Sequence, residues 1–288
     1  MATSYKIWTV AVLLSVLLVS RTAVAQTGHA AALGGEVVSD FKYLTNNALL
    51  DTEDIITSPL YAASPDSALR SPKFYLVLAG GGALWGGSYA LDQTMRSYLR
   101  SMSSSDADLL QNISYGGVSA TMALLYGYGL WYNDPRARHY ALTAGVGAGI
   151  ATLLNVGIKA AFGRLRPSQT SSHTAFFHGG ESFVSGDVTP MFALATGVSE
   201  YYGNEWYVAV PIYSLALLDG FGRMGNDAHW FSDVIGAALL GIGTTKLLLW
   251  LHQRHDEEPS RWRIFLMNAP TGTTNSQVSI GVGAAYSW

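Results

Sequence analysis

Three short blocks in the second half of this 288-residue chain hold the residue types that could do chemistry. The blocks run from Lys159 to Pro167, from Ser185 to Asp187, and from Arg223 to Asp233. Together they supply three cationic side chains, a small Ser-Gly turn, and a histidine placed four residues before an aspartate. Such a set can bind a phosphoryl group and attack its phosphorus atom, with cations in the place of a metal ion.

The cationic side chains predict a phosphate-binding site. A phosphate ester repels nucleophiles with its own charge, so a catalyst has to neutralise that charge in the transition state. Lys159, Arg166 and Arg223 suit this task, because the arginine fork matches phosphate oxygens and lysine supplies a point charge. Ser185 and Gly186 precede a helical run, and a small-residue turn at a helix N-terminus lets backbone N–H groups approach an anion.

His229 and Asp233 predict a nucleophile and the group that orients it. Their spacing of four residues places both side chains on one helix face. Asp233 would accept a hydrogen bond from one ring nitrogen, which fixes the tautomer and leaves the other nitrogen free to attack phosphorus. Water would then hydrolyse the resulting phosphohistidine. Taken alone, the two residues could be a buried hydrogen-bonded pair, so the prediction depends on their occurrence with the other blocks.

The three blocks resemble the motifs of the type 2 phosphatidic acid phosphatase superfamily, which also contains bacterial acid phosphatases and vanadium haloperoxidases. Its pattern is K-x6-R-P, then P-S-G-H, then S-R-x5-H-x3-D. The first block matches fully, and the third matches except that Gly222 stands in place of serine. The second block reads V-S-G-D at residues 184–187, so an aspartate replaces the family's histidine. The resemblance covers roughly residues 70 to 252 and implies a six-helix core.

Asp187 is the departure with the largest consequence, because the family's histidine protonates the leaving alkoxide. An aspartate donates a proton only where its pKa is raised; nearby phosphate would raise it and nearby cations would lower it. Three alternatives follow. Asp187 is the acid at low pH, or the leaving group is acidic enough to need none, as in a pyrophosphate, or His173 or His178 supplies the proton. Taken alone, Asp187 would be a helix N-cap.

Composition limits the class of protein. The chain is 49% hydrophobic and 13% charged, with a net charge of −3, which suits one sizeable core with flanking segments. No stripe of lysine and arginine appears, so nucleic acid is not a predicted partner. Cysteine is absent, which excludes disulfides, thiolate chemistry and cysteine-based metal sites. No metal or other cofactor is predicted.

The N-terminus predicts export. Lys6 precedes an apolar run at residues 7–19, and an A-x-A cleavage site ends at Ala25. The run is short for a spanning helix and is typical of a signal peptide, here residues 1–25, so the mature chain would begin at Gln26. Residues 26–72 are polar and weakly patterned, and are expected to form an N-terminal extension.

The rest of the chain predicts an all-α core at residues 73–255 and a short tail at residues 256–288. Six helical segments are expected, at residues 74–91, 109–133, 140–158, 191–202, 206–218 and 229–252. Near the end of the tail, apolar residues alternate with small or polar ones, which is strand periodicity. Turn-forming residues between 268 and 276 therefore predict a small β-hairpin that covers the bundle.

The sequence leaves two alternatives for the relation to a membrane. The first three segments are long enough to span, whereas the next two are shorter. After a cleaved signal, three spans would put Lys159 and Arg166 on the cytoplasmic side, although exported members of the family work on the outer side. The sequence thus favours an exported, periplasmic protein that is soluble or lies against a membrane over an integral membrane phosphatase.

The predicted function is metal-independent hydrolysis of a phosphomonoester or pyrophosphate through a phosphohistidine. The resemblance implies a lipid phosphate as substrate, His229 as nucleophile, Asp233 as its orienting group and Asp187 as provisional acid. It assigns phosphate binding to the remaining residues, Lys159, Arg166, Ser185, Gly186 and Arg223. Two alternatives stay open. One is a vanadate-dependent haloperoxidase, since the same pocket binds vanadate; the other is a catalytically impaired protein that binds phosphate or lipid head groups, which the aspartate at 187 favours.

Overall fold

The structure is a computed structural model that describes residues 29–61, 72–257, 262–269 and 279–286. The predicted signal peptide and the predicted start at Gln26 lie outside these residues. The chain divides into two compact units, residues 1–45 and 46–288. Helix α2 (His29–Tyr61) crosses the boundary between them. Much of the predicted N-terminal extension is therefore helical, which its weak pattern did not indicate.

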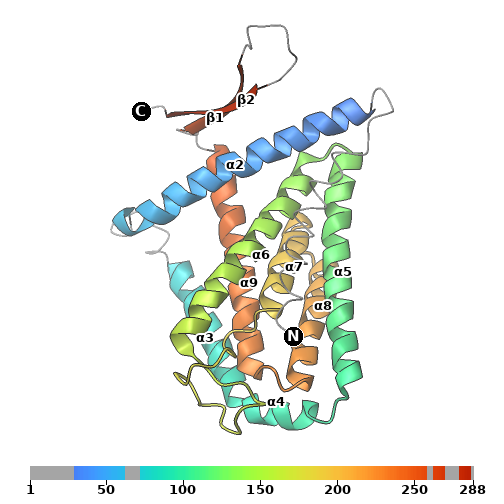
Figure 1. The fold of residues 1–288 in the computed structure, drawn as a ribbon, viewed down its shortest axis with the longest axis vertical. Coiled ribbons are helices and arrows are strands. Elements are labelled where there is room, and N and C mark those ends of the chain that lie inside the picture. The colour runs from blue at the N-terminus through green and yellow to red at the C-terminus, as the bar shows by residue number, and fades with distance from the viewer. Residues whose placement is uncertain (1–28, 62–71, 258–261, 270–278, 287–288) are drawn as a thin grey trace. The chain divides into compact units, whose positions relative to one another are not determined.

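The second unit contains the helical bundle that holds the sequence blocks (Figure 1). Six of its helices overlap the six predicted segments, while the short helix α4 is additional. With α2, the described residues contain eight helices rather than the predicted six. The bundle helices are α3 (Pro72–Ala90), α4 (Asp92–Leu99), α5 (Ser104–Trp131), α6 (Pro135–Phe162), α7 (Val188–Tyr201), α8 (Trp206–Gly225) and α9 (Phe231–Glu257).

Helix α7 lies at the centre of the bundle (Figure 1) and packs against α5, α6, α8 and α9. Ten of its fourteen residues are buried, because nearly every face of the helix meets a neighbour. Glycines allow the close approach. A Cβ on Gly197 would collide with the Cβ of Ala144 on α6, and a Cβ on Gly241 of α9 would collide with the carbonyl oxygen of Thr189. The start of α7, which carries the second block, is therefore fixed tightly between its neighbours.

The ends of α6 are set by local sequence. The Asp134 side chain caps the N-terminus by accepting from Ala137 N at 3.2 Å, and Pro135 occupies the first turn. The helix ends at Gly163, whose φ of +48° is a left-handed conformation that glycine adopts without strain. The loop to α7 folds back on this end, since His178 N donates to Gly163 O at 2.9 Å. Lys159, one turn earlier, thus lies beside that loop.

Two strands follow the bundle. Strands β1 (Trp262–Ala269) and β2 (Ser279–Tyr286) pair antiparallel, with Trp262 opposite Tyr286 and Ala269 opposite Ser279. The turn of the predicted hairpin falls at residues 270–278, outside the described residues. The same is true of the strand side chains, so the predicted covering of the bundle stays a prediction.

The outer surface of the bundle is strongly apolar. Large apolar side chains are exposed on several helices, among them Leu76, Val77, Leu124, Leu153 and Trp206. Helix α6 and the segment Phe231–Arg254 of α9 are long and apolar enough to cross a membrane by length and composition, and less than half of each apolar window is buried inside the protein, 39% and 44%. Among the three segments predicted to be long enough to span, only the one in α6 passes this test. Exposed apolar surface of this kind favours association with a membrane.

Candidate active site

Four helix ends bring the three sequence blocks together. Lys159 lies in the last turn of α6, Asp187 at the start of α7, Arg223 in the last turn of α8, and Asp233 in the first turn of α9. His229 lies in the short connection between α8 and α9. The second and third blocks are in direct contact, because Arg223 Nε lies 3.1 Å from Asp187 Oδ2.

His229 is a buried, neutral imidazole with one free nitrogen. The residue is 2% exposed, and its Nδ1 lies 2.7 Å from the carbonyl oxygen of Ser182. A carbonyl oxygen only accepts, so Nδ1 carries the proton and Nε2 keeps its lone pair. Burial lowers the pKa of His229 to about 4; the charges of Arg223 and Lys159 act in the same direction, and Asp233 opposes them. The imidazole is therefore unprotonated near neutral pH.

The link between His229 and Asp233 differs from the predicted hydrogen bond. His229 precedes α9 instead of lying in it, so the two side chains do not share a helix face. His229 Nδ1 and Asp233 Oδ2 are 3.7 Å apart, which is beyond hydrogen-bond length. Ser182 joins them: its Oγ donates to Asp233 Oδ2 at 2.5 Å, while its carbonyl oxygen accepts from His229. Asp233 thus acts on the imidazole through Ser182, a residue that the sequence motifs did not indicate.

Arg164 is a fully buried cation behind this pair, and it was also missed by the sequence motifs. Its Nη1 donates to Asp233 Oδ1 at 2.5 Å and to Ser232 Oγ at 2.8 Å. Its Nη2 donates to Asp92 Oδ2 at 2.6 Å, and Asp92 also accepts from the backbone and the hydroxyl of Ser232. The guanidinium is enclosed by three aromatic rings, those of Tyr89, Phe176 and Trp230. We call Arg164, Asp92, Asp233 and Ser232 the Arg164 cluster.

The two loop histidines considered as proton donors lie in different surroundings. His173 stacks on Tyr89, with ring centroids 4.8 Å apart, and its Nδ1 lies 3.6 Å from Asp92 Oδ2. Its carbonyl oxygen accepts from Arg164 at 2.6 Å, so its contacts place it with the Arg164 cluster. His178 is exposed in the loop that follows.

The predicted phosphate-binding groups surround the second block. Lys159 Nζ lies 3.6 Å from the place that a Cβ on Gly186 would occupy, so glycine keeps the approach to this amine open. The same amine donates to Glu181 O at 2.8 Å, and Arg166 Nη2 lies 4.0 Å from Glu181 Oε2. The Oγ of Ser185 is buried and has no hydrogen-bond partner among the described residues. A phosphate oxygen would satisfy such a group.

Asn155, one turn before Lys159 on α6, holds the second block in place. Its Nδ2 lies 3.2 Å from the carbonyl oxygens of Val184 and Ser185 and from Thr189 Oγ1. The residue is 2% exposed, so these contacts are shielded from water. No motif at the sequence level singled it out, because an asparagine within an apolar helix gives no sign of its partner.

Asp187 occupies the N-cap position of α7, but its side chain makes no capping hydrogen bond. The carboxylate instead faces Arg223, at 3.1 Å from its Nε. The helix-cap alternative therefore fails for the side chain. The carboxylate at the position of the family's histidine is thus paired with one of the predicted phosphate-binding cations.

Gly222 has a steric reason to replace the family's serine. A Cβ at this position would collide with the carbonyl oxygen of Ala107 on α5 and would lie 2.7 Å from Gln111 Cγ. Helices α5 and α8 are therefore too close for a side chain here. The family's hydroxyl cannot be accommodated without moving one of the two helices.

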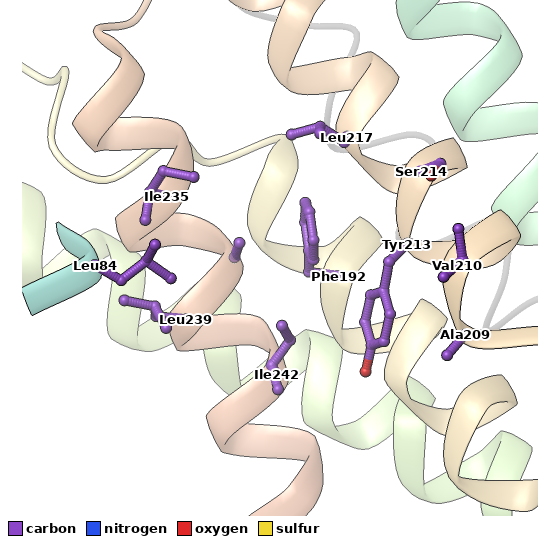
Figure 2. A pocket seen from close by; sticks show the side chains of 11 residues that line it. Leu84, Phe192, Ala209, Val210, Tyr213, Ser214, Leu217, Ile235, Leu239 and Ile242 are labelled. Atoms are coloured by element: carbon purple, nitrogen blue, oxygen red, sulfur yellow. The ribbon is translucent and has the colours of Figure 1, made fainter. Parts of the chain in front are cut away.

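An apolar groove of about 470 Å³ lies between α3, α7, α8 and α9 (Figure 2). Phe192 and Tyr213 stand in its middle, and the rim is formed by aliphatic residues of α3, α8 and α9 (Figure 2). Its lining includes Leu217 on α8 and Ile235 on α9, which are two residues from Asp219 and Asp233 in sequence. Three of the helices that line the groove, α7, α8 and α9, also carry residues of the polar site at their ends.

Part of this chain is similar to known proteins. The family model of the PAP2 superfamily matches residues 140–257. The lipid A 1-phosphatase of Porphyromonas gingivalis is 34% identical over 137 residues, which cover 46% of this chain and 28% of that protein. No solved structure gives a significant match. The PAP2 match at residues 140–257 includes all three sequence blocks and agrees with the resemblance that their motifs predicted.

Proposed function

We propose that the bundle at residues 72–257 is a phosphatase that hydrolyses a phosphomonoester or a pyrophosphate through a phosphohistidine. The observation that carries the proposal is the state of His229. Its Nδ1–H donates to Ser182 O, its Nε2 keeps a lone pair, and its pKa lies well below neutrality. Such an imidazole is a nucleophile at pH 7 without a separate base. The PAP2 match over residues 140–257 supports the same class of reaction.

In the proposed first step, the three cations and the Ser185-Gly186 backbone hold the phosphate oxygens. His229 Nε2 then forms a bond to phosphorus while the bond from phosphorus to the leaving oxygen breaks. The developing charge is neutralised by Lys159, Arg166 and Arg223. The leaving oxygen takes a proton from Asp187, the proposed acid. In the second step, water attacks phosphorus and gives up a proton, and the N–P bond breaks to regenerate the imidazole.

A phosphorylated lipid is the proposed substrate class. The apolar groove lies between helices whose ends carry the site and offers room for part of an acyl chain (Figure 2). The exposed apolar surface of the bundle would place the protein at a membrane, where such a substrate resides. The name of the bacterial relative, a lipid A 1-phosphatase, is consistent with a substrate that is a phosphate on a lipid. We further propose that the protein is exported and acts outside the cytoplasm.

A second candidate is a protein that binds phosphate or a lipid head group without turnover. The observation that favours it is the 3.1 Å contact of Asp187 with Arg223, which ties the proposed acid to a cation of the phosphate-binding set. Both candidates share the cationic pocket, so binding assays do not distinguish them. An assay of phosphate release does, because only the phosphatase turns over its substrate.

Phosphate release is expected to survive EDTA and to be inhibited by vanadate. In the proposed site, lysine and arginine side chains neutralise the phosphate in place of a bound metal ion. Vanadate inhibits because it adopts the five-coordinate geometry of phosphorus in the transition state. The purified protein is assayed with alkyl phosphates, diacylglycerol phosphate and an isoprenoid pyrophosphate, with EDTA and at several pH values. Loss of activity in EDTA that a divalent metal restores would refute the proposed chemistry. Binding of inorganic phosphate with no release from any substrate would favour the second candidate.

Filling the groove is expected to weaken binding of long-chain substrates selectively. Ala209→Trp would place an indole among the lining residues, and the loss of about two buried methylenes from an acyl chain raises KM roughly tenfold. The comparison uses alkyl phosphates of different chain length. Leu247→Trp, at an exposed position of α9 outside the groove, is the matched control. An equal effect of Ala209→Trp on short and long chains would show that the groove does not hold the substrate.

A further inference from the structure

Asp219 is a buried acid that the proposed reaction does not yet use. It lies on α8 with no exposed surface, and neither carboxyl oxygen has a hydrogen-bond partner among the described residues. Burial and the negative charge of Asp187 together raise the pKa of Asp219 to about 8, while Arg223 and Tyr115 act in the opposite direction. At neutral pH the group is therefore largely a neutral carboxylic acid.

The position of Asp219 connects it to the site. It precedes Arg223 by four residues on α8, so both side chains lie on one face of the helix. Arg223 in turn contacts Asp187. In the described part of the chain, the titratable and charged groups that act on Asp219 are Asp187 at the start of α7, Arg223 on its own helix and Tyr115 on α5. Arg223 thus contacts Asp187 directly, and both residues act electrostatically on Asp219.

A purely structural role for Asp219 has a clear cost. A carboxyl group that is withdrawn from water destabilises a fold relative to an apolar side chain of similar size. The neighbouring residues Leu217 and Leu218 show that this stretch of α8 otherwise carries apolar side chains. Perturbed acids of this kind concentrate at functional sites. The chemistry that the site lacks is a proton donor, since Asp187 stands where the family has histidine.

We propose that Asp219 and Asp187 form a carboxyl pair in which Asp219 supplies the proton that Asp187 passes to the leaving oxygen. The inference rests on the proposed phosphatase function. Two carboxyl groups in one electrostatic environment do not both ionise readily, so the pair retains a proton even though Asp187 contacts a cation. Asp219 acts through Asp187 and is therefore a positioning and proton-storing residue.

The proton balance of the step is complete. His229 Nε2 bonds to phosphorus and the bond to the leaving oxygen breaks, with its electron pair staying on that oxygen. The leaving oxygen takes a proton from Asp187, and Asp187 takes the proton of Asp219. When water attacks the phosphohistidine, the proton that it releases returns to the pair. One water is consumed, and the products are the alcohol and phosphate.

The test compares two leaving groups in Asp219→Asn, which keeps the shape of the side chain and cannot titrate. An alkyl phosphate has a basic leaving group, whereas p-nitrophenyl phosphate has an acidic one that needs little protonation. We expect Asp219→Asn to slow the alkyl phosphate by about a hundredfold at pH 7 and p-nitrophenyl phosphate by much less. In the wild type, kcat for the alkyl phosphate should fall as pH rises through about 8, and this limb should be absent from the variant.

Controls keep the outcomes separate. Glu205→Gln, an exposed carboxyl at the start of the same helix, should leave both rates and the pH profile unchanged. Equal slowing of both substrates by Asp219→Asn, or an unchanged pH limb, would overturn the proton-storing role while leaving the phosphatase intact. A wild type that hydrolyses neither substrate would instead overturn the proposed function.

If Asp219→Asn does not fold, infrared spectra of the wild type provide the test. A buried carboxylic-acid band should be present at pH 6 and vanish above pH 8. Its absence at pH 6 would contradict the proposal.

Discussion

Replacement of His229 with alanine is expected to lower the rate of phosphate release by at least about a thousandfold, because it removes the proposed nucleophile. The fold should persist. The side chain makes one hydrogen bond to the Ser182 carbonyl oxygen, while Trp230 and Asp233 on either side keep their own contacts. Circular dichroism and the unfolding temperature check the fold, and phosphate release checks the rate.

The matched control for that variant is His178→Ala, which removes an exposed histidine from the loop before the second block. It should keep the wild-type rate. Wild-type turnover in His229→Ala would mean that another group attacks phosphorus. A rate lost in both variants would point instead to a role for the loop.

Replacement of Arg164 with methionine is expected to have the largest effect on stability. It removes the partner of two carboxylates, Asp92 and Asp233, which are both fully buried. Breaking a buried ion pair from one side costs about 3–5 kcal/mol, because the remaining charge has no partner and no water. The free energy of unfolding, measured with denaturant, checks this value. Activity should fall as well, since Asp233 would no longer be held against Ser182.

Arg136→Met is the matched control, because Arg136 also lies over two aromatic rings, those of Tyr140 and Tyr201, but on the surface. An exposed arginine of this kind contributes about 1 kcal/mol or less. Adding Asp92→Asn to Arg164→Met should recover part of the lost stability, since one unpaired charge is removed. A stability loss in Arg164→Met no greater than in Arg136→Met would show that the Arg164 cluster is not what fixes Asp233.

The sequence predicted those helices of the bundle whose apolar runs and end signals are contained in one continuous segment. The long charge-free runs at residues 109–133 and 140–158 fall almost entirely within α5 and α6, and Asp134-Pro135 and Gly163 mark the two ends of α6 by side-chain capping and backbone conformation. The short helix α4 was missed because its eight residues, three of which have charged or amide side chains, form too short and too polar a segment to stand out in the sequence. The helical part of residues 26–72 was missed because this segment is polar and weakly patterned.

The site residues that belong to motifs with fixed spacing along the chain were predicted. The site residues that only the fold brings together were missed. Lys159 comes from the first block, and Arg223 and His229 come from the third, so their types and intervals were enough. Ser182 and Asp92 act through contacts between residues far apart in sequence, such as the Arg164–Asp92 ion pair. A single sequence contains no trace of such a pairing.

The error about His229 and Asp233 has a specific cause. The rule that residues four apart share a face holds only inside a helix, and α9 begins two residues after His229. The polypeptide therefore reaches Asp233 by a turn, and Ser182 from another segment bonds to both side chains, with its Oγ to Asp233 and its carbonyl oxygen to His229. His229 Nδ1 and Asp233 Oδ2 are therefore 3.7 Å apart instead of within hydrogen-bond length.

The central claim is that phosphate is transferred to His229 Nε2, and rapid quenching tests it most directly. The wild type is mixed with p-nitrophenyl phosphate, stopped with alkali within the first turnover, digested and analysed by mass spectrometry. Alkali preserves phosphohistidine, so the account predicts phosphate on the peptide that contains His229 and none in His229→Ala. Phosphate on a different residue, or a burst of p-nitrophenol with no phosphopeptide at any time, would contradict it.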